Sequence, residues 1–111
     1  MISRNTEVII KPGEKISTVW AYLKQLPRAD LHYFVHEFGT TNWWHATSPG
    51  ASLIEEQDFA GVLHLIKNQK AFWVVVDNTH YILVWATHET YDINLRAIKD
   101  RFTCQIITSS S

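Results

Sequence analysis

Two histidines in this chain of 111 residues each stand two positions before a threonine, in His45-Ala-Thr47 and in His88-Glu-Thr90. In an extended strand, residues i and i+2 point to the same face, so each imidazole would lie beside a hydroxyl group. Two such pairs facing one cleft could hold a phosphodiester and transfer protons as general acid and general base. The imidazoles would then lie roughly 5–8 Å apart, with a hydrogen bond of about 3 Å on each side of the phosphate.

The repeated His-x-Thr pattern resembles the core motif of the two-histidine phosphoesterases, over these two tripeptides. The resemblance implies a small phosphodiesterase or ribonuclease whose catalytic residues would be His45, Thr47, His88 and Thr90. We keep this enzyme as the alternative to a non-enzymatic function.

A dense aromatic segment points instead to recognition. Eight aromatic or imidazole side chains occupy the fourteen positions from 32 to 45: His32, Tyr33, Phe34, His36, Phe38, Trp43, Trp44 and His45. Neighbours on a strand point to opposite faces, so if one tryptophan of the Trp43-Trp44 pair is in the core, the other lies at the surface or in an interface. An exposed tryptophan can anchor a partner. The alternative is that both tryptophans are buried.

The leading hypothesis is therefore a small non-enzymatic binding protein. Its binding residues would be Trp43, Trp44, His45 and Tyr33, and its partner a protein or a small apolar ligand. A third hypothesis is an immunity-type or inhibitor protein in a larger complex, which fits a small chain without catalytic motifs.

Metal and cofactor chemistry finds little support in the sequence. His32 and His36 are four residues apart, which suits a metal ion on a helix. On a strand they would lie about 13 Å apart, too far for one ion. Cys104 is the only cysteine, and its apolar neighbours predict a buried, unreactive thiol. The four glycines are scattered and form no phosphate loop. We expect neither a metal nor a cofactor.

The composition indicates a globular protein. Apolar residues make up 46% of the chain and the formal net charge is −1, without a run of Lys or Arg. Nucleic-acid binding usually needs a basic surface, so no nucleic-acid partner is expected. No signal-peptide core and no apolar run near the ~20 residues of a membrane span is present. We expect one soluble, cytoplasmic domain over residues 1–111 and no membrane partner.

Hydrophobic periodicity predicts five elements in the first 70 residues. They are a strand over 7–11, a helix over 14–26, a strand over 31–38, a strand over 43–47 and a helix over 59–68. The spacing of apolar residues in 31–38 also fits a helix, but the aromatic and β-branched content favours a strand. The helix at 59–68 could begin at the capping-box pair Ser52 and Glu55, or at Asp58.

The C-terminal part contains the clearest elements. Residues 71–76 and 80–87 form a predicted hairpin, followed by a helix capped by Asp92 and a last strand over 103–108. The fold class is therefore α+β: a mostly antiparallel sheet of four to six strands, with two or three helices packed mainly on one face. Both faces of the hairpin are apolar, and a short chain covers two faces with difficulty, so we expect a homodimer.

Overall fold

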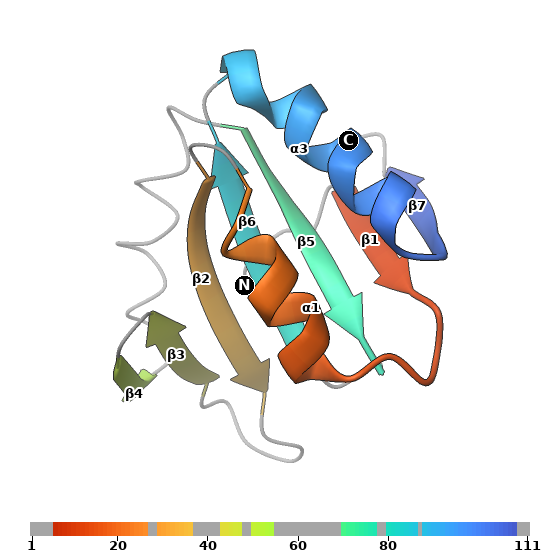
Figure 1. The fold of residues 1–111 in the computed structure, drawn as a ribbon. Coiled ribbons are helices and arrows are strands. Elements are labelled where there is room, and N and C mark those ends of the chain that lie inside the picture. Colours follow the sequence, from red (N-terminus) through yellow and green to blue (C-terminus); the bar gives the residue numbers. More distant parts are fainter. Residues whose placement is uncertain are drawn as a thin grey trace.

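The computed structural model of the chain describes residues 6–26, 29–36, 43–47, 50–54, 70–77, 80–86 and 88–108. These residues form one mixed sheet and two helices, α1 and α3 (Figure 1). The described elements are β1 (Thr6–Ile10), α1 (Ile16–Leu23), β2 (Ala29–His36), β3 (Trp43–Thr47), β4 (Gly50–Ile54), β5 (Lys70–Val76), β6 (His80–Ala86), α3 (His88–Arg101) and β7 (Cys104–Thr108). The predicted α+β class is confirmed.

The sheet has seven strands in the order β4-β3-β2-β6-β5-β1-β7, more than the four to six expected. The extra strand is β4, which pairs with β3 in antiparallel register from Trp43↔Ile54 to Thr47↔Gly50. Pairing is antiparallel between all neighbouring strands except β1 and β5, which run parallel. This parallel pair brings β1 into the sheet beside β5, and β7 then pairs with β1 at the edge, with Thr6 opposite Thr108.

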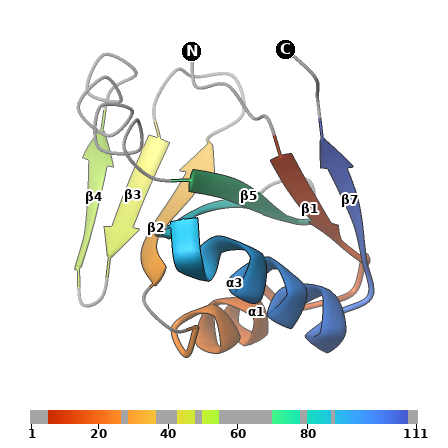
Figure 2. The ribbon, with the colours of Figure 1, turned by 90° about the horizontal axis from the view of Figure 1, so that it is seen from above.

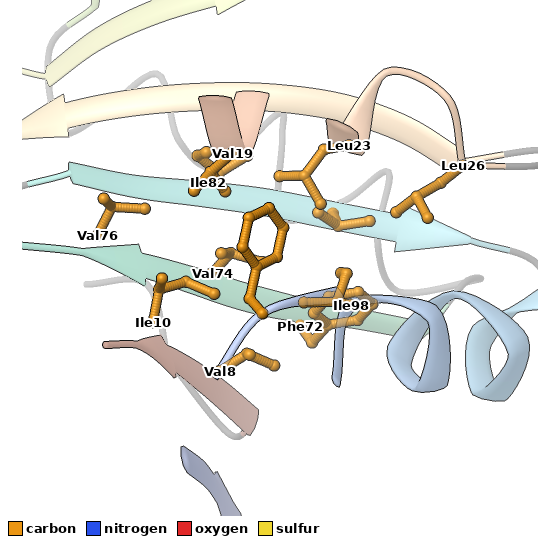
Figure 3. Packing of buried hydrophobic residues seen from close by; sticks show 12 residues of the cluster. Val8, Ile10, Val19, Leu23, Leu26, Phe72, Val74, Val76, Ile82 and Ile98 are labelled. Atoms are coloured by element: carbon orange, nitrogen blue, oxygen red, sulfur yellow. The ribbon is translucent and has the colours of Figure 1, made fainter. Parts of the chain in front are cut away.

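Both helices cover the same face of the sheet (Figure 2). Alternate residues of β1, β5 and β6 point toward the helices because successive strand residues face opposite sides. This face forms a hydrophobic core with buried residues of both helices (Figure 3). Its members are Val8, Ile10, Val19, Leu23, Leu26, Phe72, Val74, Val76, Ile82, Val84, Ile98 and Phe102.

The two helices are joined to each other through Tyr22 of α1. Its hydroxyl group donates a hydrogen bond of 3.1 Å to the carbonyl oxygen of Ala97 in α3. Its ring packs edge-on against Phe102, with 5.4 Å between the ring centroids. These contacts fix the position of α1 relative to the C-terminal end of α3.

The opposite face of the β5–β6 hairpin is also buried. Trp73, Val75, Leu83 and Trp85 lie there, and each is at most 4% exposed. Val74, Val75, Leu83 and Val84, two from each face, are each at most 4% exposed, as expected for a hairpin that is apolar on both faces. Both apolar faces of the hairpin are thus buried within a single chain. Neither face needs a second copy of the chain to cover it.

The strand that the aromatic content favoured over 31–38 is confirmed for the described residues 31–36. Two other expected features take another form. Ser52 lies inside strand β4 and not in a helix cap, because the segment pairs with β3. Asp92 lies within α3, which begins one turn earlier at His88. The helix expected over 59–68 lies outside the described residues.

Candidate functional site

The described aromatic residues nearest to the predicted binding surface are three rings centred on Tyr33. Trp20 of α1 and Tyr33 of β2 have ring centroids 5.5 Å apart, with their planes tilted by 52°. His80 of β6 stacks on the other side, 6.0 Å from Tyr33 and 13° from parallel. We call Trp20, Tyr33 and His80 the Tyr33 ring group. It joins residues 60 positions apart in the sequence.

The pairing of β2 with β6 positions this ring group. Tyr33 is opposite Ile82, and His80 is opposite Val35, so Tyr33 and His80 are diagonal neighbours on one face. This is the face that carries the helices, since Ile82 belongs to the core beneath them. Trp20 reaches Tyr33 from α1, whose buried residues Val19 and Leu23 are held in the core. Burial of α1 therefore fixes the ring group.

All three rings are half-buried, so each keeps part of its surface in water. Burial raises the pKa of the Tyr33 hydroxyl group above its usual value. The ammonium group of Lys24, one turn after Trp20, lies 5.5 Å from the centroid of the indole ring. At this distance a cation is attracted to the ring face. The ring group is thus an amphipathic surface with a positive charge at one end.

Strand β3 places the other predicted binding residues next to Tyr33. In the antiparallel register, Ala46 is opposite Tyr33, His45 is opposite Phe34 and Trp44 is opposite Val35. Trp43 follows opposite His36. Trp43, Trp44 and His45 are therefore on β3, which pairs directly with β2, the strand that carries Tyr33. Which of the two tryptophans is exposed lies outside what the structure describes.

The two His-x-Thr tripeptides do not share one geometry. His45 and Thr47 are in strand β3, as expected, whereas His88 and Thr90 form the first turn of helix α3. On a helix, residues i and i+2 do not face each other, so the expected pairing of imidazole and hydroxyl does not apply to the second tripeptide. Thr90 is moreover buried. The assumption that both tripeptides are extended was wrong.

The register also separates the two histidines along the sheet. His45 is opposite Phe34, which is opposite Tyr81 at the start of β6. With about 3.3 Å per residue and about 4.8 Å per strand, the backbone of His45 lies roughly 19 Å from that of Ala86 at the end of β6. His88 follows two residues later, at the start of α3. The backbone of His45 is therefore well separated from the end of β6, from which His88 follows, and the phosphodiesterase alternative stays a prediction.

Among the side chains that the structure describes, no group of three His, Cys, Asp or Glu residues is placed to hold a metal ion. His32 and His36 are strand residues in β2. Cys104 is half-buried in β7 rather than fully buried. Burial raises the pKa of its thiol, and the charge of Lys99 partly offsets this rise. A raised pKa lowers the fraction of reactive thiolate, which agrees with an unreactive cysteine.

Trp20, Lys24 and His80 were missed as site residues by the sequence reasoning. Trp20 falls within the predicted helix over 14–26, and its contact with Tyr33 becomes visible only once α1 is docked on the sheet. His80 is the first residue of the predicted strand over 80–87. Neither residue has a local pattern that indicates its contact with Tyr33.

No protein-family model, no curated protein and no solved structure matches the chain. None of the described helices is long and apolar enough to cross a membrane.

Proposed function

We propose that the protein is a small non-enzymatic binding protein, which contacts a protein or a small apolar ligand through the Tyr33 ring group and the adjoining strand β3. One observation carries this proposal. Tyr33 of β2 contacts both Trp20 of α1 and His80 of β6, and all three rings are only partly buried. Aromatic side chains with an open surface supply large contact areas at low entropy cost, and they dominate binding interfaces.

The proposal extends to β3, where Trp43, Trp44 and His45 are the predicted binding residues. Trp44 is opposite Val35, on the same face of the sheet as Tyr33, so a ligand that covers the ring group would meet this position as well. Trp43 and His45 alternate to the other face of the sheet. Self-association into a homodimer is a second part of the proposed function.

The binding proposal can be tested with indole as a probe in NMR titrations of the whole chain. We expect chemical-shift changes at the Trp20 indole N–H and in the rings of Tyr33 and His80. The variants Trp20→Ala and Trp44→Ala should weaken the response, since loss of an aromatic anchor costs about 2 kcal/mol, or thirty-fold in affinity.

The matched control is Ile93→Ala, which removes an apolar side chain that is 58% exposed on α3. It should leave the titration unchanged. Shifts that map to residues other than the ring group and β3, or a response that Ile93→Ala abolishes and Trp20→Ala does not, would contradict the proposal.

A further inference from the structure

Strand β7 forms one edge of the sheet. It pairs with β1 on one side, and no other described strand pairs with it. Figure 2 shows no described helix or strand beyond its outer side. A strand in this position presents a row of backbone N–H and C=O groups, which can pair with another strand.

One hydrogen bond fixes which residues present those groups. The backbone N–H of Lys11 donates to the carbonyl oxygen of Thr103 over 2.9 Å, next to the pair Ile10↔Cys104. Hydrogen-bonded pairs alternate along an antiparallel ladder, so Gln105 and Ile107 also direct their backbone groups toward β1. Cys104, Ile106 and Thr108 therefore direct theirs outward.

The sequence of this edge lacks charge and proline, two of the features that usually prevent strand pairing. Residues 102–111 contain no charged residue and no proline. Natural edge strands are commonly protected by such residues. Ile107 is 41% exposed on the face away from the helices, and it is the one strand residue among the exposed large hydrophobic residues that the structure describes. Two uncharged copies of this strand would bring no like charges together.

We propose that a second copy of the chain pairs with this edge, with the two β7 strands antiparallel and a two-fold axis at Ile106. Ile106 is the middle residue of Cys104–Thr108, so this register pairs all five residues of both strands. Cys104 is then opposite Thr108 of the second copy, and Gln105 is opposite Ile107. The contact uses the same surface on both copies and closes as a dimer.

The inference rests on the self-association part of the proposed function and not on ligand binding. Three strands, β6, β5 and β1, separate β7 from β2, which carries Tyr33. A chain that does not dimerise would therefore not contradict ligand binding at the ring group. A chain that does not bind indole would not contradict pairing at β7.

Sedimentation equilibrium of the whole chain tests the contact. We expect the wild-type mass to rise from one chain toward two with increasing concentration. Ile107→Lys should hold the mass at one chain, because it places a charge in the contact. The matched control Ile93→Lys alters the other isoleucine that is exposed among the described side chains, and it should behave as wild type. Circular dichroism should show that both variants are folded.

Disulfide formation tests the register. Gln105→Cys and Ile107→Cys are made separately in a Cys104→Ser background and then mixed under mild oxidation. The two positions form a non-hydrogen-bonded pair with a Cα separation of about 4.5 Å, which a disulfide can span. The mixture should give a covalent dimer of the two different variants, and each variant alone should give at least ten-fold less.

Two sets of results would overturn the proposal. The first is a mass of one chain at high micromolar concentration, or a dimer that Ile107→Lys leaves intact and Ile93→Lys disrupts. The second is cross-linking within each single variant but not between them, or masses well beyond two chains, which would indicate open pairing of β7 with another edge.

Discussion

At the scale of single residues, Leu83 is the clearest test of how the hairpin is buried. Its side chain is 0% exposed, on the sheet face away from the core beneath the helices. Truncation to Ala removes three buried carbon atoms and leaves a cavity, so we expect Leu83→Ala to lower the free energy of unfolding by about 2–5 kcal/mol. Chemical denaturation measures this loss. A loss below about 1 kcal/mol would mean that this face is poorly packed.

Asp77, which directly follows β5, has a strained backbone conformation. Its φ angle is +55°, in the left-handed region, where aspartate is tolerated and glycine is favoured. We expect Asp77→Ala to lower the free energy of unfolding by about 1 kcal/mol relative to Asp77→Gly. Thermal unfolding of the two variants gives the comparison. Equal stabilities would contradict a left-handed conformation at this position.

Tyr33 should make stability depend on alkaline pH. Burial raises its pKa above the usual 10.0, so the folded state disfavours the ionised form. Stability from this group is complete below the usual pKa and is lost as pH rises through the higher folded pKa. The unfolding free energy of wild type should therefore fall more steeply above pH 10 than that of Tyr33→Phe. Parallel pH profiles for the two proteins would argue against this burial effect.

At the scale of elements, the contact between α1 and α3 depends on one polar group. The Tyr22 hydroxyl group bonds the Ala97 carbonyl oxygen across 75 residues of sequence. Tyr22→Phe keeps the ring contact with Phe102 and removes this hydrogen bond, so we expect a loss of about 0.5–1.5 kcal/mol. Urea denaturation measures it. Tyr22→Ala serves as the comparison and should cost more, because it also removes the ring.

Most strands and both described helices could be predicted from residue types, but β4 could not. The strands predicted over 7–11, 43–47 and 103–108 are found as β1, β3 and β7, with ends within a residue. Ser52 and Glu55 have the spacing of a capping box, yet Ser52 pairs with His45 in a strand. The spacing of residues predicts only the conformation that a segment would prefer in isolation. Residues 50–54 form a strand because they pair with β3 through backbone hydrogen bonds.

The start of α3 and the Tyr33 ring group show the same limit. Asp92 is a good cap by type, but the helix continues through it and begins at His88. Tyr33 was predicted as a binding residue from the aromatic density around it. Its contacts with Trp20 and His80 depend on the β2–β6 register and on the docking of α1, neither of which a local pattern contains.

At the scale of the whole molecule, the surface proposed for self-association changes from a face of the hairpin to an edge of the sheet. The sequence suggested that one face of the hairpin would need a second copy. Both faces of that hairpin are buried within one chain, including Trp73 and Trp85. The unprotected backbone of β7 is the feature that remains, and pairing there would extend the sheet and leave both faces as they are.

The pairing of Thr6 with Thr108 has a consequence for chain connectivity. Opposite residues of two antiparallel strands have Cα atoms about 5 Å apart, so the outer ends of β1 and β7 can be joined by a linker of a few residues. A circularly permuted chain could then begin at β4 and end at β3, with the break in the connection that follows Thr47. Such a permutant would keep every strand pairing, while β1 and β7 would become neighbours in sequence instead of the first and last strands.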